Sequence, residues 1–142
     1  MENFMKARNI ILSSLDHARL CDLLITAKQF GVAKSALLDT LEGELGRAKI
    51  VAPQDIPPYV VTMNTCVHLI DTNTGEEFQY TLVFPSDANS KKGKLSILSD
   101  LGVAIIGFSV GDTIEWEFPE GARNIRVNMI SFQPEATKQY DL

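Results

Sequence analysis

Few residues of this chain of 142 residues have the type and spacing that chemistry requires. Its two histidines, His17 and His68, lie in different segments, and neither has cysteine or histidine neighbours at the spacing of a metal site. Each histidine is therefore predicted to be a surface residue. The two cysteines, Cys21 and Cys66, are predicted to be separate buried thiols in a reducing compartment.

Three carboxylates gather in Asp112-x-x-Glu115-x-Glu117, where paired acids could bind a cation or exchange protons. Glu115 and Glu117 alternate with Trp116, so we interpret them as the solvated face of a strand. The chain also lacks a phosphate-binding loop, a nucleophile elbow and a dinucleotide fingerprint. We therefore expect no enzyme, no metal site and no cofactor.

Composition places the chain among globular proteins and argues against nucleic acid as its partner. Apolar residues make up 45% and charged residues 22% of the sequence. The net charge of −5 arises in residues 51–142, whose twelve acidic and six basic side chains outweigh the charge of +1 on residues 1–50. A phosphate-binding surface requires clustered bases, and the one basic cluster, Lys91-Lys92-Gly93-Lys94, is predicted to be a solvated loop. We expect no sequence-specific binding of nucleic acid.

The sequence also predicts that the chain does not enter a membrane. Its longest apolar run, residues 101–108, is far shorter than the ~20 residues that span a bilayer. Residues 1–8 are polar and lack the apolar stretch of a signal peptide. We expect a cytoplasmic monomer.

Residues 1–50 are predicted to form an antiparallel helical hairpin, a short coiled coil. The first helix, residues 13–30, has a capping serine at Ser13 or Ser14, a carboxylate at Asp16 and a terminating Gly31. A second helix follows over residues 33–48. At about 1.5 Å per residue, sixteen residues give arms of about 24 Å. Each helix carries an apolar stripe, which consists of Leu20, Leu23, Leu24 and Ala27 in the first and Leu37, Leu38, Leu41, Leu45 and Ala48 in the second.

Three prolines break regular structure over residues 51–58, which we interpret as a linker. Beyond it, residues 59–142 alternate with the period of strands. The expected strands cover residues 61–69, 78–84, 114–118 and 125–129, with a turn at 71–75 and another at 119–121. A change of register at Ile130 and Phe132 indicates a bulge or the end of the strand. The chain is thus predicted to be α+β, a helical hairpin followed by a compact antiparallel sheet with one short helix.

The stretch from Lys94 to Asp112 is the most informative part of the chain. It predicts a short strand, a polar turn, one apolar helical segment and a Gly-Asp turn. Ser99 and Asp100 suit a helix N-cap, because their side-chain oxygens can accept backbone N–H groups of the first turn. The buried face of the helix is predicted to consist of Leu101, Ala104, Ile105 and Phe108.

This segment resembles the signature of the C-terminal domain of the Gre transcript-cleavage factors, where a Ser-rich turn precedes L-G-x-A-L-L-G-x-x-V-G-D. Here residues 101–112 read L-G-V-A-I-I-G-F-S-V-G-D. The resemblance covers residues 58–131 and implies a fold related in shape to the prolyl isomerase FKBP. Isomerase activity would need an aromatic-lined pocket, which the sequence does not assemble from Trp116, Phe118 and Tyr80. Asp100 stands where the Gre pattern usually has proline.

A second resemblance extends over the whole length. V-V-T-M-N at residues 60–64, T-L-V-F-P at 81–85 and Q-P-E-A at 133–136 are similar to the family called regulator of nucleoside diphosphate kinase. Members of that family pair a short coiled coil with a Gre-like domain. The family name implies a regulatory connection to nucleoside diphosphate kinase.

The Gre resemblance implies docking on the rim of the secondary channel of RNA polymerase. The polymerase-binding residues are then expected to be Ser96, Leu98, Ser99, Asp100 and Leu101.

In Gre factors, acids at the hairpin tip help to bind the catalytic Mg²⁺. The tip expected here, residues 26–34, has no Asp or Glu. Its expected surface residues are Lys28, Gln29, Phe30 and Lys34. We therefore expect a polymerase-binding regulator that does not promote transcript cleavage and competes with Gre-type factors. Regulation of nucleoside diphosphate kinase, and an FKBP-like isomerase or chaperone, are the alternatives.

Overall fold

The computed structural model describes residues 10–118 and 120–142. The expectations for residues 1–8, and part of the turn at 119–121, lie outside the described residues. Two long helices, α1 (Ser14–Phe30) and α2 (Ser35–Arg47), form an antiparallel hairpin, and a short helix, α3 (Asp100–Ile105), lies later in the chain. The strands are β1 (Ile11–Ser13), β2 (Lys49–Val51), β3 (Cys66–Asp71), β4 (Glu77–Val83), β5 (Lys94–Ser96), β6 (Thr113–Phe118) and β7 (Gly121–Phe132). Short 3-10 helices cover Pro53–Asp55, Pro85–Asp87, Ser90–Lys92 and Glu135–Thr137.

The caps that the sequence predicts for the first helix are confirmed. Ser13 is the N-cap, and its side chain accepts the backbone N–H of Asp16 at 3.0 Å. Gly31 ends the helix with a positive φ of 63°, and its N–H donates to the carbonyl of Ala27 at 2.9 Å. The second helix is shorter than expected, because Ala48 has extended backbone and leads into β2.

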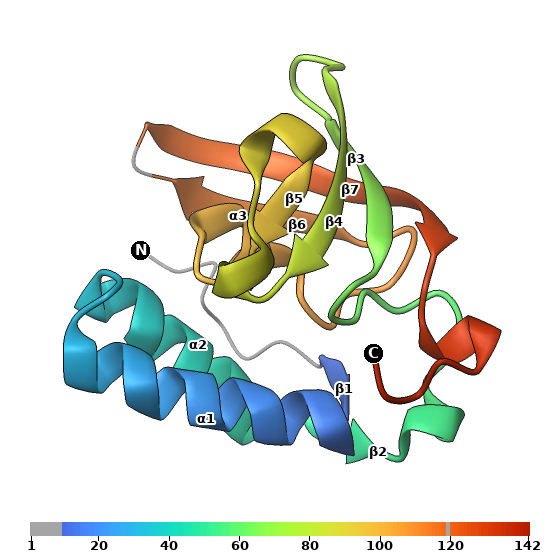
Figure 1. The fold of residues 1–142 in the computed structure, drawn as a ribbon. Coiled ribbons are helices and arrows are strands. Elements are labelled where there is room, and N and C mark those ends of the chain that lie inside the picture. The colour runs from blue at the N-terminus through green and yellow to red at the C-terminus, as the bar shows by residue number, and fades with distance from the viewer. Residues whose placement is uncertain (1–9, 119) are drawn as a thin grey trace.

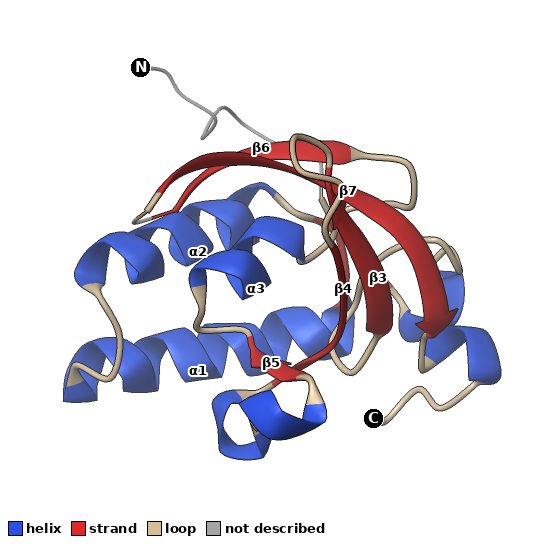
Figure 2. Cartoon of the chain, turned by 90° about the horizontal axis from the view of Figure 1, so that it is seen from above, coloured by secondary structure: helices blue, strands red, loops and turns tan. Residues whose placement is uncertain are grey.

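The main sheet has the order β5-β4-β3-β7-β6 and curls around α3, which lies on its concave side (Figures 1 and 2). Neighbouring strands are antiparallel except β4 and β5, which are parallel. The sheet is therefore mixed, where the sequence predicted an antiparallel one. Residues 84–93 contain two 3-10 turns and carry the chain back to Thr81, so that β5 runs alongside the last three residues of β4. Strand periodicity does not reveal this return. Strands β1 and β2 form a separate parallel pair.

The expected strand at residues 61–69 begins only at Cys66. Upstream, the Thr65 hydroxyl accepts the backbone N–H of Thr62 at 3.0 Å and lies 2.8 Å from the Thr62 hydroxyl. Asn64 has a φ of 67°. Because these hydroxyls bond each other and the backbone, the chain turns there, and regular strand pairing starts only at Cys66. The predicted bulge is confirmed, since Cys66 pairs with Phe132 but Val67 pairs with Ile130.

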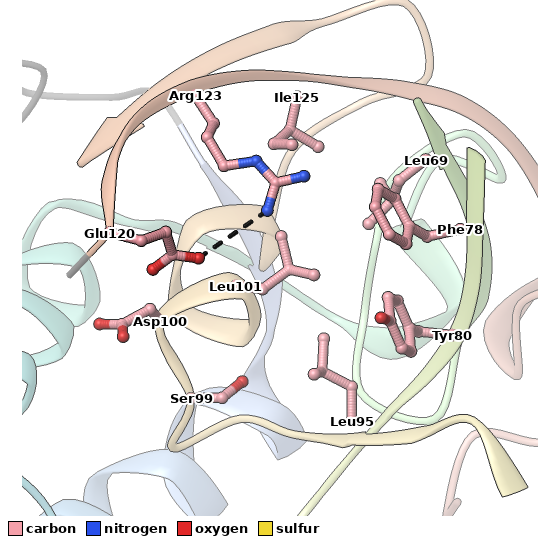
Figure 3. Close-up of a pocket in the computed structure, with 10 residues that line it drawn as sticks. All are labelled: Leu69, Phe78, Tyr80, Leu95, Ser99, Asp100, Leu101, Glu120, Arg123 and Ile125. Atoms are coloured by element: carbon pink, nitrogen blue, oxygen red, sulfur yellow. Dashed lines mark ion pairs between the residues drawn. The ribbon is translucent and has the colours of Figure 1, made fainter. Parts of the chain in front are cut away.

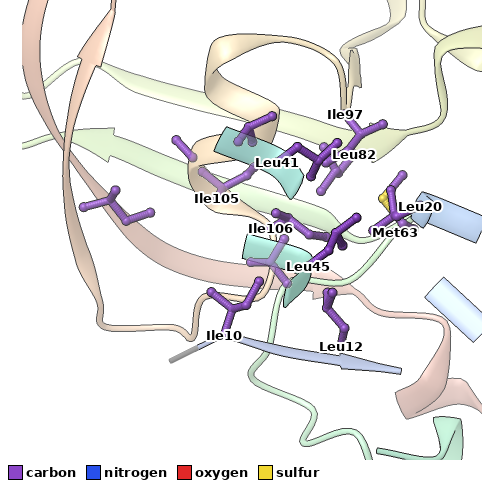
Figure 4. Close-up of a cluster of buried hydrophobic side chains, with 14 of the residues drawn as sticks. Ile10, Leu12, Leu20, Leu41, Leu45, Met63, Leu82, Ile97, Ile105 and Ile106 are labelled. Carbon is purple, nitrogen blue, oxygen red and sulfur yellow. The ribbon is translucent and has the colours of Figure 1, made fainter. Parts of the chain in front are cut away.

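The helical hairpin shares one hydrophobic core with the sheet and α3 (Figure 4). Its predicted stripe faces this core, and Leu20 and Leu41 have no exposed surface. The hairpin thus lies along the sheet domain. The core cluster includes Leu20, Leu24, Ala27, Leu38, Leu41 and Leu45 of the hairpin with Met63, Leu82, Ile97, Val103, Ala104, Ile105 and Ile106.

Asp16 ties the base of α1 to the sheet domain. This carboxylate is 1% exposed, accepts the N–H of Met63 at 3.0 Å and pairs with Arg19 at 2.6 Å. Burial raises the pKa of Asp16, although the hydrogen bonds from Arg19 and Met63 lower it. Glu135 lies nearby and accepts the Thr62 hydroxyl at 2.8 Å, and burial likewise raises its pKa. Two acids therefore share the junction between hairpin and sheet.

The α+β class and the helical hairpin are confirmed, and the domain boundaries at residues 50 and 58 stay a prediction. Within residues 10–118 and 120–142, no helix has both the length and the apolar character needed to cross a membrane.

Candidate functional site

The corner between β5 and α3, residues 96–101, is built by two serines. The Ser96 hydroxyl accepts the N–H of Leu98 at 3.0 Å. The Ser99 hydroxyl donates to the carbonyl of Ser96 at 2.6 Å and accepts the N–H of Gly102 at 3.1 Å. Ser99 is thus the N-cap of α3, and Asp100 is the first residue of the helix. These bonds hold the corner in one conformation.

Two glycines of the signature are required by close packing. A Cβ on Gly102 would lie 2.3 Å from the Ser96 carbonyl oxygen, so only glycine lets α3 begin this near the end of β5. Gly107 has a φ of 79°, and a Cβ there would lie 2.5 Å from the Cβ of Ile10. The sequence pattern around residues 101–112 therefore specifies backbone geometry.

A cavity of about 310 Å³ adjoins the corner (Figure 3). Phe78 and Tyr80 of β4 stack with their ring centroids 6.1 Å apart and form one wall. Of the predicted polymerase-binding residues, Ser99, Asp100 and Leu101 line the cavity, whereas Ser96 and Leu98 do not. The lining residues are Leu69, Phe78, Tyr80, Leu95, Ser99, Asp100, Leu101, Glu120, Arg123 and Ile125.

The sequence interpretation missed this cavity because it combined Tyr80 with Trp116 and Phe118 and did not consider Phe78. Tyr80 lines it, but Trp116 is 4% exposed and belongs to the core, and the side chain of Phe118 lies outside the described residues. The signal for Phe78 was available, since residues two apart on a strand share a face. No sequence pattern predicts that Arg123 or Glu120 lines the cavity. Arg123 lies on β7 and Glu120 directly precedes it, and β7 is brought to the cavity by its pairing with β3 and β6.

Arg123 supplies the main positive charge at the cavity. Its guanidinium pairs with Asp71 at 3.0 Å and with Glu120 at 4.0 Å, and lies 5.6 Å from the ring centroid of Phe78. Hydrogen bonding from the backbone of Asn73 lowers the pKa of Asp71 against the effect of burial, and Arg123 lowers it further. The cavity is therefore apolar and aromatic inside, with fixed charges at its edge.

The hairpin tip has a different character. Phe30 is 70% exposed and Val32 is 64% exposed. The Lys28 ammonium pairs with Glu42 and lies 3.8 Å from Asp39, so it points back along α2. The hydrogen bond to Glu42 raises the pKa of Lys28. Gln29 and Lys34 are exposed. Among the described residues, no group of three or more His, Cys, Asp or Glu side chains could hold a metal ion.

The domain arrangement just described is that of the bacterial Gre-type factors. Residues 56–132 match the model for "Transcription elongation factor, GreA/GreB, C-term", and residues 8–51 match the model for the Rnk N-terminus. A solved structure, a prokaryotic transcription elongation factor GreA/GreB from Nitrosomonas europaea, is 40% identical with a TM-score of 0.72. That match covers 89% of this chain and all of the other.

Curated relatives extend the comparison to the full length. The Regulator of nucleoside diphosphate kinase of Escherichia coli K12 is 36% identical over 137 residues, which are 96% of this chain and 98% of the relative. Transcription elongation factor GreA of Thermodesulfovibrio yellowstonii is 35% identical over 96 residues, 68% of this chain and 61% of the relative. The chain belongs to the family of the regulator of nucleoside diphosphate kinase, a relative of the Gre factors.

Proposed function

We propose that this chain is a non-enzymatic regulator that binds RNA polymerase at the rim of its secondary channel. The main observation in support of this proposal is the corner at residues 96–101, where the Ser99 hydroxyl bonds the backbone on both sides. This corner lies within the region that matches the GreA/GreB family model. A surface already held in its binding conformation loses little entropy when a partner docks. The corner is such a surface, and its backbone is fixed from both sides.

The chemistry of the corner indicates the kind of polymerase surface it fits. Asp100 sits at the start of α3, and Glu120 lies on the same side of the cavity, opposite Phe78 and Tyr80 (Figure 3). The aromatic wall of Phe78 and Tyr80 offers a seat for an apolar side chain, and the two carboxylates suit a basic neighbour. We infer a polymerase segment with an apolar residue flanked by Lys or Arg.

We infer that the chain does not promote transcript cleavage. Cleavage at a metal centre requires carboxylate oxygens near the ion. The tip carries none at residues 26–34. Behind the tip, the ammonium of Lys28 pairs with Glu42 and lies 3.8 Å from Asp39. If such a protein docks at the Gre site, it competes with cleavage factors for that site without promoting cleavage itself.

Binding of the purified chain to core polymerase tests the proposal. Asp100→Arg reverses the charge of the corner and should weaken binding at least about tenfold. Asp22→Arg makes the same charge change on an exposed position of α1, outside residues 96–101, and should leave the dissociation constant within about twofold. Equal effects of the two changes would reduce the interaction to net charge and would refute docking through the corner.

A second candidate function is regulation of nucleoside diphosphate kinase, which is favoured by the name of the E. coli relative. The two functions separate in one experiment. If the chain acts on the kinase directly, it changes the activity of purified kinase in the absence of polymerase. If it acts through transcription, kinase activity stays constant while the chain binds core polymerase.

A further inference from the structure

A histidine and a cysteine on α1 contact each other in a way that the mechanism above does not use. His17 and Cys21 are four residues apart and therefore lie on the same face of the helix. The Cys21 Sγ lies 3.8 Å from the His17 Nδ1. The His17 Nε2 lies 3.0 Å from the Leu45 carbonyl oxygen of α2. The sequence predicted a surface position for His17, and the structure shows it half-buried and in contact with Cys21.

The Leu45 carbonyl fixes the proton on the imidazole. A carbonyl oxygen accepts and cannot donate, so the bond requires a hydrogen on Nε2. The neutral ring then presents a bare Nδ1 lone pair to the Cys21 thiol. This is the order of groups that activates a nucleophile, with a thiol, a base and a third group that orients the base.

The pair lines a cavity of about 320 Å³ between α1 and α2. Its walls are mainly apolar, and Ile25 at its edge is 65% exposed. Among the residues described there, the charged group is Glu42, which pairs with Lys28, while Asp39 lies 3.8 Å from that same ammonium. A neutral, apolar molecule suits this space better than an anion. The lining residues are His17, Cys21, Leu24, Ile25, Glu42, Leu45 and Gly46.

We propose that His17 is the base for Cys21 and that Cys21 is a site of S-thiolation by small neutral disulfides. The thiol proton moves to the His17 Nδ1, and the Cys21 thiolate attacks one sulfur of the disulfide. A new S–S bond forms to Cys21 as the old S–S bond breaks. The other half leaves as a thiolate, so the small disulfide is the oxidant and no further reactant is needed.

Cys66 is the internal reference for this proposal. It lies on β3, and the Gln79 side-chain amide donates to its Sγ at 3.4 Å. Burial raises the pKa of the Cys66 thiol, but hydrogen bonds from Ser131, Gln79 and Thr81 outweigh that effect and lower it. The lowered pKa of Cys66 thus arises from neutral hydrogen-bond donors and does not involve a histidine. Its reaction should not depend on His17.

The test uses single-cysteine variants and 2,2′-dipyridyl disulfide, a neutral reagent whose released thione absorbs light. The Cys66→Ser variant keeps Cys21, and the second-order rate constant is measured at pH 6.5. Adding His17→Gln preserves a donor for the Leu45 carbonyl but removes the base. We expect that change to slow Cys21 at least about tenfold. A change of less than about twofold would overturn the proposal.

Two further measurements keep the result interpretable if His17→Gln disturbs the fold. In the Cys21→Ser variant, His17→Gln should leave the rate at Cys66 within about twofold, which reports an intact sheet. With His17 in place, the rate constant of Cys21 is also followed from pH 5 to pH 8, and it should fall less steeply towards acid than that of a free thiol such as glutathione. A profile that follows an ordinary thiol would refute activation by His17, whatever the variant does.

Discussion

The corner and the hairpin tip are both turns between regular elements, but they are built in opposite ways. At the corner, Ser99 bonds backbone on both sides and Gly102 is in contact with the Ser96 carbonyl. At the tip, a Cβ on Gly31 would meet nothing within 4 Å, and Phe30 is mostly exposed. One turn is fixed by its neighbours, and the other is shaped only by local backbone preference.

The difference separates two roles that Gre-type factors combine. A rigid, partly buried corner beside an aromatic cavity suits docking, whereas chemistry at a distance depends on what the tip carries. Here the tip carries an aromatic ring, an amide and lysines. The proposed function rests on this contrast, a rigid corner suited to docking and a tip without the acids of cleavage chemistry.

The largest expected effect contrasts a core residue of the hairpin with its exposed tip. Leu41 has no exposed surface, so Leu41→Ala should lower the free energy of unfolding by about 2–5 kcal/mol. Phe30→Ala, at a side chain that is 70% exposed, should change it by less than about 0.5 kcal/mol. Urea denaturation measures both. Similar losses would mean that the tip, too, is packed in solution.

A matched pair of glycine changes sharpens the comparison between the two turns. Gly102→Ala places a Cβ 2.3 Å from the Ser96 carbonyl oxygen and should cost about 2–3 kcal/mol of stability. At Gly31→Ala the new Cβ meets nothing within 4 Å, so the loss of stability should be only the cost of a positive φ for alanine, about 1 kcal/mol. The two variants are compared by denaturant midpoint. If Gly31→Ala were the more damaging, the corner would not be the more constrained turn.

The smallest effect concerns pH and two Asp–Arg pairs. The pKa of Asp71 is lowered, so its stabilising contribution is present above the unfolded pKa of about 3.9 and is lost as the pH falls through the folded value. The pKa of Asp16 is raised, so its contribution is present below the unfolded value and is lost as the pH rises through the folded one. The two pairs therefore respond to acid with opposite sign.

Asparagine variants measure these opposite slopes. Asp71→Asn should be less stable than the parent at pH 7, and the difference should shrink towards pH 3. Asp16→Asn removes one partner of a buried ion pair, so it should be less stable than the parent at pH 7. Because the pKa of Asp16 is raised, this difference should widen on acidification. Parallel pH profiles for the two variants would contradict the assigned pKa directions.

The sequence predicted what depends on local pattern. Helix caps such as Ser13 and Gly31, the apolar stripes and the bulge at Ile130 follow from capping chemistry and periodicity, and the structure has them. The sequence also predicted that Ser99 or Asp100 is the N-cap of α3. Only the structure shows that Ser99 is the cap and Asp100 is the first residue of the helix. Local rules therefore gave the elements and the corner.

What the sequence did not predict depends on contacts between distant segments. The parallel pairing of β5 with β4, the approach of Arg123 to Phe78, and the packing of the hairpin on α3 join residues that no spacing rule connects. The contact of His17 with Cys21 is local, but its meaning depends on the Leu45 carbonyl of α2, 28 residues away. Tertiary structure, and not local propensity, assembles the cavity beside the corner and the surroundings of the His17–Cys21 pair.

A cleavage assay on stalled, backtracked elongation complexes tests the central claim most directly. The chain is added alone and then together with a Gre-type cleavage factor, and transcript length is followed over time in Mg²⁺. The account predicts no shortening with the chain alone and slower factor-stimulated cleavage as its concentration rises, with Asp100→Arg relieving the inhibition. Rapid Mg²⁺-dependent shortening by the chain alone would contradict it.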